Sequence, residues 1–203
     1  MLDTADNVEL EAELRVPDDP RAGAVLAHPH PQYGGDMHSL VPSVLFDALP
    51  DAGIAALRFN FRGVGRSTGS YDGGQGERED VVAALDALAT AVPGVPLILA
   101  GWSFGGDVCL MVTDERIAAW LAIAAPLRTF PRDEIAAADD PRPKLLVVPE
   151  RDQFNPPDAA RTATADWRNT RIEVLGGADH MCVGRTDRIV ELAVELVSSL
   201  AAR

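Results

Sequence analysis

The 203-residue chain has little lysine, little cysteine and few aromatic side chains. Lysine occurs only at position 144, and 18 basic residues stand against 31 acidic ones, so the formal net charge is −13. An acidic surface repels phosphate backbones and anionic lipids, which argues against nucleic acids and membrane surfaces as partners. The two cysteines, Cys109 and Cys182, are too few for a disulfide framework and are typical of a reducing compartment.

Long apolar runs and targeting signals are also missing. No stretch of about 18 apolar residues occurs, so the sequence predicts no membrane-spanning helix. The first six residues contain neither the basic nor the apolar region of a signal peptide, so we expect a cytoplasmic protein. No repeat, linker or low-complexity tract interrupts the chain. Its length suits one core, and we predict a single domain over residues 1–203.

Short apolar runs alternate along the chain with amphipathic stretches of helical length. Continuous apolar strands are typical of a parallel sheet, so we predict an α/β fold with a mostly parallel central sheet and helices on both faces. The connection from 125 to 144 is too short for a cap domain, and the alternating segment 8–16 is a candidate antiparallel edge strand. The predicted strands are 24–27, 54–61, 97–100, 120–124, 145–148 and 171–175, and the predicted helices are 39–51, 77–91, 105–113, 158–167 and 185–202.

The segment Gly101-Trp102-Ser103-Phe104-Gly105 matches the pattern G-x-S-x-G and stands between a predicted strand and a predicted helix. A sharp turn of this kind holds the serine in a strained conformation at the carboxyl edge of the sheet, and the glycines leave room for strand and helix to approach closely. Free N–H groups at the start of the helix point to the same place. The pattern predicts Ser103 as a nucleophile, and the alternative is a serine that only caps the helix.

A serine hydroxyl needs a base, and the sequence contains four histidines. His180 follows the predicted strand 171–175, so its loop lies at the carboxyl edge of the sheet, where the base must be. Asp152 follows the preceding strand and completes the chain order nucleophile, acid, base, in which the acid orients the imidazole. Glu150 is an alternative acid, and Asp152 then only forms a turn. Asp179 adjoins the histidine and is expected to point elsewhere.

A tetrahedral intermediate needs two N–H donors for its negatively charged oxygen. The backbone N–H of Phe104 is the first predicted donor, and that of His30, in the proline-stiffened loop after strand 24–27, is the second. The same loop offers the alternative of a metal site built from His28, His30 and His38. The spacing of the first two on an irregular segment and the lack of a nearby cysteine argue against it. We expect neither a metal nor a cofactor.

The segment Arg62-Gly63-Val64-Gly65-Arg66-Ser67 follows a predicted strand and partly resembles a dinucleotide-binding fingerprint. Thr68 stands in place of the third glycine, and the strand before it is not the first of the chain. A tight structural turn is therefore the better interpretation.

Three further segments carry a resemblance to a known family, namely His28-Pro29-His30-Pro31, Gly34-Gly35 and Asn60-Phe61-Arg62-Gly63. Together with G-x-S-x-G they resemble the α/β-hydrolase superfamily along nearly the whole chain. Within it they are similar to a small lidless group related to the dienelactone hydrolase-like and acyl-peptidase-like branches. The resemblance implies an α/β-hydrolase fold without a cap domain, a Ser103–Asp152–His180 triad and hydrolysis without a cofactor.

We therefore expect a serine hydrolase that cleaves small-molecule esters or thioesters with small acyl groups through an acyl-enzyme intermediate. Tyr33, Phe104, Phe154 and Met181 are candidates to line its open cleft. The net charge favours neutral or cationic substrates. A peptidase or an acyltransferase would use the same triad, and a non-catalytic binding module could share the fold. No feature of the sequence determines an oligomeric state.

Overall fold

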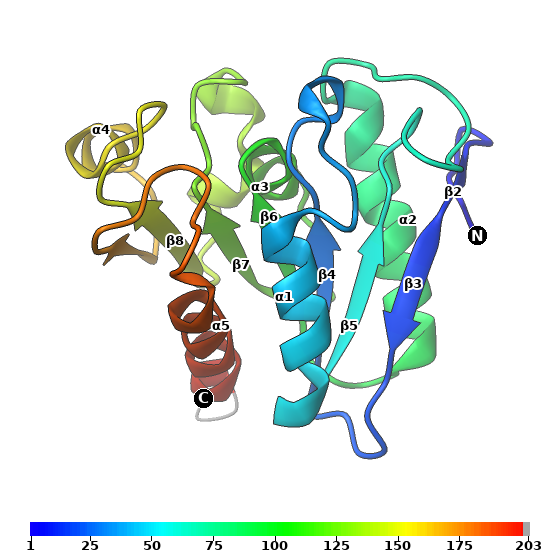
Figure 1. The fold of residues 1–203 in the computed structure, drawn as a ribbon. Coiled ribbons are helices and arrows are strands. Elements are labelled where there is room, and N and C mark those ends of the chain that lie inside the picture. The colour runs from blue at the N-terminus through cyan, green and yellow to red at the C-terminus, as the bar shows by residue number, and fades with distance from the viewer. Residues whose placement is uncertain (201–203) are drawn as a thin grey trace.

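A seven-stranded sheet runs through the middle of the protein, whose computed structural model describes residues 1–200 (Figure 1). The strand order is β3-β5-β4-β6-β7-β8-β9, in which β3 is antiparallel to β5 and every other neighbouring pair is parallel. The predicted, mostly parallel sheet is thus confirmed. Its strands are β3 (Ala12–Arg15), β4 (Ala22–Ala27), β5 (Ile54–Phe59), β6 (Leu97–Trp102), β7 (Ile117–Ile123), β8 (Lys144–Pro149) and β9 (Thr170–Leu175), and a separate two-stranded sheet consists of β1 (Leu2–Asp3) and β2 (Glu9–Leu10).

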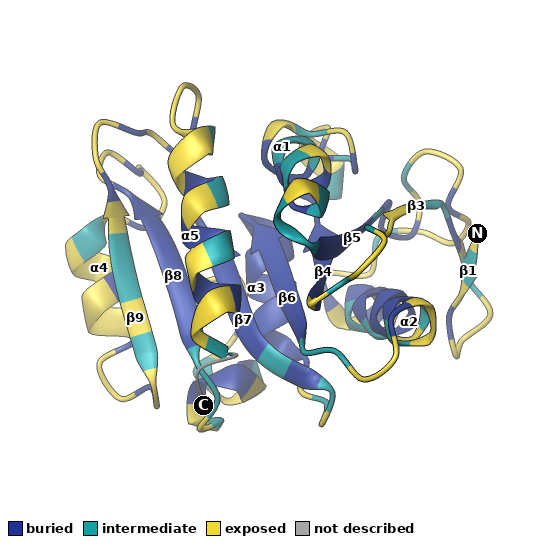
Figure 2. Cartoon of the chain, turned by 90° about the horizontal axis from the view of Figure 1, so that it is seen from below, coloured by how far each residue is buried: buried dark blue, intermediate teal, exposed yellow. Residues whose placement is uncertain are grey.

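The central strands are buried because helices cover both faces of the sheet. Every residue of β4, β6 and β8 is buried, and these strands are dark blue in Figure 2. Successive apolar side chains point to opposite faces, so Val25 belongs to one core and Leu26 to the other. This burial on two sides explains why the strands consist of continuous apolar runs.

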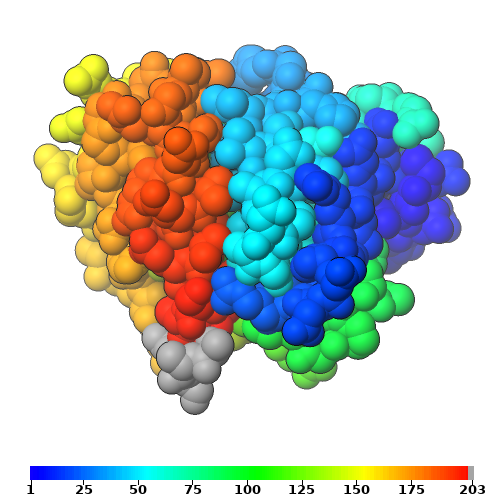
Figure 3. Space-filling model, turned by 60° about the horizontal axis from the view of Figure 1, so that its bottom comes forward, coloured from blue at the N-terminus to red at the C-terminus, as the bar shows by residue number. Residues whose placement is uncertain are grey.

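Two helices cover one face of the sheet and three cover the other. On the first face, α1 (Leu40–Ala48) and α5 (Thr186–Leu200) lie side by side (Figure 3). On the second face lie α2 (Gln75–Ala91), α3 (Phe104–Met111) and α4 (Pro157–Ala163). These five helices match the predicted ones with ends that differ by a few residues.

The largest shift of a single helix end within the described residues is that of α4, which ends at Ala163, four residues before its predicted end at 167. The chain turns there because Trp167 packs into the core with only 8% of its surface exposed. The predicted end of the last helix at 202 lies outside the described residues.

The predicted edge strand over 8–16 is divided in two: β2 pairs with β1, whereas β3 pairs with β5. Glu11 separates the two strands. Its backbone N–H donates to the hydroxyl of Ser67, and its carboxylate accepts hydrogen bonds from Asn60 and Arg66. These bonds hold the predicted turn before α2 against the edge of the sheet.

The carboxyl edge of the sheet carries no additional domain. Between β7 and β8, residues 124–143 contain two short 3-10 helices and no other regular element. The connection is therefore as short as predicted, and no cap domain is present in residues 1–200. No helix in this described part of the chain is long and apolar enough to cross a membrane. The 3-10 helices of the protein are η1 (Pro31–Tyr33), η2 (Pro50–Ala52), η3 (Arg132–Glu134) and η4 (Ala136–Asp139).

Candidate active site

Ser103 lies at the sharp turn between β6 and α3. Its backbone has φ 55° and ψ −121°. Residues other than glycine rarely adopt such a conformation, which costs on the order of 1–3 kcal/mol. The flanking glycines permit it, because a Cβ at Gly101 would lie 2.2 Å from the carbonyl oxygen of Gly105, and a Cβ at Gly105 would lie 2.5 Å from that of Ala27. Strand and helix therefore approach each other as closely as the G-x-S-x-G pattern predicts.

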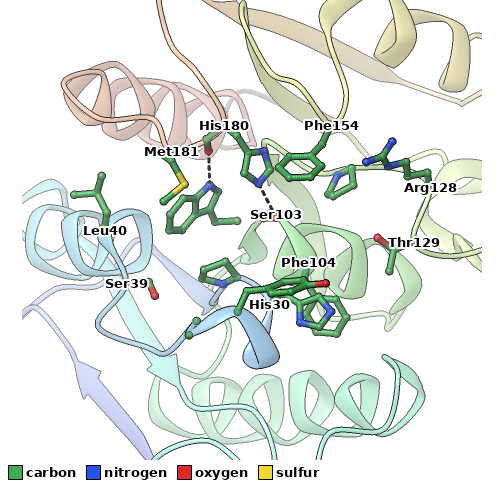
Figure 4. Close-up of a pocket in the computed structure, with 16 residues that line it drawn as sticks. His30, Ser39, Leu40, Ser103, Phe104, Arg128, Thr129, Phe154, His180 and Met181 are labelled. Carbon is green, nitrogen blue, oxygen red and sulfur yellow. Dashed lines mark hydrogen bonds between the residues drawn. The ribbon is translucent and has the colours of Figure 1, made fainter.

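Two hydrogen bonds join Ser103, His180 and Asp152. His180 Nε2 lies 2.9 Å from Ser103 Oγ (Figure 4), and His180 Nδ1 lies 2.9 Å from Asp152 Oδ2. An ionised carboxylate only accepts hydrogen bonds, so Nδ1 carries the proton and Nε2 is left as the acceptor for the serine hydroxyl. The imidazole is thus held in the tautomer that can take the serine proton.

The carboxylate of Asp152 is fixed from its other side by the backbone. Its Oδ1 accepts a hydrogen bond of 2.8 Å from the N–H of Phe154, and the side chain is buried. The two other carboxylates that the sequence offers are engaged elsewhere. Glu150 accepts a hydrogen bond from the N–H of Gly177. Asp179 accepts one from the backbone N–H two residues further along the chain. Of the three, only Asp152 contacts the imidazole.

Trp102 positions the loop that carries the histidine, a contact that the sequence did not predict. Its indole N–H donates to the backbone carbonyl of His180 over 3.2 Å, as the second dashed line in Figure 4 shows. Because the tryptophan directly precedes Ser103 and is 3% exposed, this bond ties the loop of His180 to the strand that ends beside Ser103. The bulky residue before the serine was the only signal in the sequence for this contact.

The backbone N–H groups of His30 and Phe104 are available to a ligand. Within residues 1–200 neither N–H donates a hydrogen bond, and both residues line the pocket above Ser103. Phe104 begins α3, so its N–H belongs to the first turn of a helix and has no partner inside it. The loop of His30 approaches closely because Gly35 lies against it, where a Cβ would come within 2.2 Å of the Pro29 carbonyl oxygen.

The imidazole of His30 packs among aromatic rings beneath this loop. Its centroid lies 4.8 Å from that of Phe104 and 5.1 Å from that of Tyr71. Its Nδ1 accepts a hydrogen bond from the N–H of Gln32, so Nε2 carries the proton and faces the Tyr71 hydroxyl at 3.3 Å. Burial lowers the pKa of His30, which keeps the ring neutral. The side chain thus stiffens the loop at a residue that lines the pocket.

His28 does not combine with the neighbouring histidines into a metal site. Its Nε2 accepts a hydrogen bond from the N–H of Phe61, and its Nδ1 donates to the carbonyl of Pro29 over 2.6 Å. Burial lowers the pKa of His28 to about 4, so the ring is neutral and both nitrogens are used in the fold. In the described residues, no three histidine, cysteine or acidic side chains are grouped as metal ligands.

A pocket of about 590 Å³ opens above Ser103. The four predicted lining residues, Tyr33, Phe104, Phe154 and Met181, all contribute to it. The loop after β7 and the start of α1 add walls that the sequence analysis missed. These segments follow β7 and β4 at the carboxyl edge of the sheet, and that place in the chain order is the signal that could have identified them. The missed lining residues include Ser39, Leu40, Pro126, Arg128 and Thr129.

Asp107 anchors the loop after β7 to the start of α3. It lies in the first turn of α3, and its Oδ1 accepts a hydrogen bond of 3.0 Å from the N–H of Leu127. Leu127 has φ 53°, so this loop turns back sharply toward the pocket. Within residues 1–200, Oδ2 of Asp107 has no hydrogen-bond partner within 3.5 Å, although the hydroxyl and N–H of Thr129 lie near enough to the carboxyl to act against the effect of burial on its pKa. Burial raises the pKa of this carboxyl to about 6.

Comparisons with known proteins agree with this fold. A family model described as an alpha/beta hydrolase domain matches residues 20–198. The chain belongs to the α/β-hydrolase family. Among curated proteins, this α/β hydrolase is similar to an uncharacterized protein of Rickettsia prowazekii, with 32% identity over 174 residues that cover 81% of this chain and 73% of the relative.

Solved structures of serine hydrolases share the fold of this α/β hydrolase. An α/β serine hydrolase homologue from Coxiella burnetii is 31% identical with a TM-score of 0.82, and the match covers 92% of this chain and 90% of that one. A Xanthomonas campestris α/β serine hydrolase without a lid is 26% identical with a TM-score of 0.84, covering 98% and 92% of the two chains. The predicted resemblance to lidless α/β serine hydrolases is therefore confirmed.

Proposed function

We propose that this α/β hydrolase is an esterase-type enzyme that cleaves small-molecule esters or thioesters with small acyl groups. The observation that carries the proposal is the pair of 2.9 Å contacts that connects Ser103 Oγ through the His180 imidazole to Asp152. A base within about 2.6–3.2 Å of a serine hydroxyl makes it a nucleophile, and a carboxylate behind the base stabilises the imidazolium that forms.

In the proposed reaction, His180 Nε2 takes the proton of Ser103 as the serine oxygen attacks the carbonyl carbon of the substrate. The N–H groups of His30 and Phe104 donate to the oxyanion that develops. His180 then gives its proton to the leaving oxygen or sulfur, and the acyl group stays bound to the serine. Water then attacks the acyl carbon while the imidazole takes a proton from it. The bond from the acyl carbon to Ser103 Oγ breaks, the imidazole returns the proton to Oγ, and the free acid leaves.

The open pocket supports the preference for small acyl groups. Without a cap domain, only the short loops at the edge of the sheet can surround a substrate, so long acyl chains gain little buried surface. The acidic surface and two buried, unbridged cysteines support a cytoplasmic enzyme that acts on small molecules rather than on nucleic acid.

Labelling with a fluorophosphonate probe tests the proposal. We expect the probe to attach covalently to the protein and the Ser103→Ala variant to remain unlabelled. A series of p-nitrophenyl esters from acetate to decanoate then measures kcat/KM, and we expect the shorter acyl chains to be preferred. Absence of labelling in the parent protein would refute the proposal. Faster cleavage of peptide amides than of esters would instead identify a peptidase, and faster turnover with an added alcohol than with water an acyltransferase.

A further inference from the structure

The pocket around Ser103 has a charge that the net charge of the protein does not predict. The chain contains 31 acidic and 18 basic residues. Nevertheless, none of the residues in 1–200 that line the pocket is aspartate or glutamate, and Arg128 is the only arginine or lysine among them. An acidic protein therefore presents a single positive charge at the wall of its pocket, and the carboxyl of Asp107, whose pKa that charge helps to lower, is buried and does not line the pocket.

Arg128 lies over the Phe154 ring, and its charge helps to lower the pKa of the buried Asp107 carboxyl, but its N–H donors are not used within residues 1–200. Across the described part of the chain it makes neither an ion pair nor a side-chain hydrogen bond, whereas Arg62, Arg116 and Arg142 are each paired with an aspartate. A guanidinium carries five N–H donors in a planar fork that matches the two oxygens of a carboxylate. These donors remain available to a ligand.

The guanidinium lies within reach of the reacting groups. Its central carbon is 5.6 Å from the centroid of the Phe154 ring, and that ring is 4.5 Å from the imidazole of His180. In Figure 4, Arg128 and Thr129 lie on one side of Ser103, whereas Leu40 and Met181 lie on the other. The nucleophile thus stands between a polar, cationic wall and an apolar wall.

The loop that carries Arg128 is anchored on buried groups. Asp107 accepts the hydrogen bond from the N–H of Leu127, and Asn155 donates to the carbonyl of Ala125 over 2.9 Å. The side chain of Phe130, on the far side of the arginine, is buried. The backbone around Arg128 is therefore fixed, which lowers the entropy cost of using its side chain for binding.

We propose that Arg128 selects substrates that carry a carboxylate or a similar anionic group on the half of the ester that lies against Phe154 and Thr129. This inference rests on the hydrolase function proposed above and specifies its substrate class. It replaces the expectation of neutral or cationic substrates that the net charge alone suggests. Distant surface carboxylates are screened beyond about 8 Å at physiological ionic strength, whereas a charge-assisted hydrogen bond to the arginine acts at contact distance.

Two pairs of matched esters test the proposal without assuming which half of the substrate is anionic. The first pair is phenyl hydrogen adipate and its carboxamide, phenyl adipamate, with the charge on the acyl half. The second pair is 3-carboxyphenyl acetate and 3-carbamoylphenyl acetate, with the charge on the leaving half. The ratio of kcat/KM for carboxylate over carboxamide is measured for the parent protein and for the variants Arg128→Gln, Arg128→Lys and Arg161→Gln.

We expect the parent protein to prefer the carboxylate in at least one pair by about tenfold, the typical effect of one charged hydrogen bond at an exposed site. Arg128→Gln should bring the ratio to about one, mainly by raising KM for the carboxylate, and Arg128→Lys should keep part of the preference. Arg161→Gln removes an equal charge from the exposed face of α4, outside the pocket, and should keep the parent ratio. Turnover of both esters with no preference, or equal losses for both in Arg128→Gln, would overturn the proposal.

A binding measurement separates this inference from the proposed function. In the Ser103→Ala background, calorimetry compares the binding of the carboxylate and carboxamide compounds with and without Arg128→Gln. A preference that depends on the arginine supports the anion site even if the parent protein cleaves none of the esters. Equal binding of both compounds to Ser103→Ala refutes the anion site even if the esters are cleaved.

Discussion

The buried carboxyl of Asp107 makes the stability of the protein depend on pH. Its folded pKa of about 6 lies above its usual value of 3.8, since burial disfavours the charged form. Between these two values the folded protein binds more protons than the unfolded chain, so stability falls as the pH rises from about 4 to about 6. The pKa difference corresponds to about 3 kcal/mol, because one pH unit is worth about 1.4 kcal/mol.

Asp107→Asn removes this titration while it keeps an oxygen that can accept the bond from Leu127. The quantity of interest is the free energy of unfolding of the variant minus that of the parent. We expect this difference to increase by about 3 kcal/mol between about pH 4 and pH 8. Urea unfolding followed by circular dichroism at several pH values measures the difference. All other titrating groups are common to both proteins, so their contributions cancel.

Asp114→Asn is the matched control for this experiment. Its carboxyl has a pKa lowered to about 2, first of all by hydrogen bonds from Arg116. The folded and unfolded pKa values of Asp114 thus both lie below pH 4, and the difference between this variant and the parent should be nearly flat from pH 4 to 8. A flat difference for Asp107→Asn as well would refute the argument, because it would mean that burial does not raise the pKa of Asp107.

The turn at Ser103 and the two neighbouring residues that hold it in place give three further expectations. Ser103→Gly should be more stable than Ser103→Ala by about 1 kcal/mol in urea unfolding, since glycine adopts φ 55° without strain. Gly105→Ala should destabilise the fold by on the order of 2 kcal/mol or more in thermal unfolding, because its Cβ would press on the Ala27 carbonyl. Trp102→Phe removes the hydrogen bond to the His180 carbonyl and should lower kcat by about tenfold with little change in KM, whereas an unchanged kcat would refute a positioning role.

The fold was predictable from the sequence wherever burial alone determines structure. The run 97–100 is apolar throughout because both faces of β6 are covered, and such runs identified the parallel strands. The antiparallel edge strand within 8–16 is present as β3, but the division of this segment into two strands was not predicted, because it depends on polar contacts distant in sequence. Glu11 divides the predicted edge strand through bonds to Asn60 and Arg66, and no local pattern reveals those partners.

The candidate site was predictable to the extent that parallel strands bring their carboxyl ends together. Ser103, Asp152 and His180 each follow a strand, and their order along the chain assigned them to one cluster before any distance was known. The indole contact to the backbone of His180 was not predictable in this way. Trp102 reaches the His180 loop only because β6 ends beside it, and nothing in the sequence specifies that distance.

The charge of the pocket shows most clearly what a composition cannot supply. Net charge is a sum over the whole surface and governs long-range attraction, which salt screens within about 8 Å. Substrate selection depends instead on the few groups that the fold brings to the nucleophile. Here a loop that bends back at Leu127, held by Asp107, places Arg128 beside the aromatic ring of Phe154, which packs against His180. A chain with a net charge of −13 can therefore have a cationic pocket, because three-dimensional contacts and not residue counts determine which charges meet the substrate.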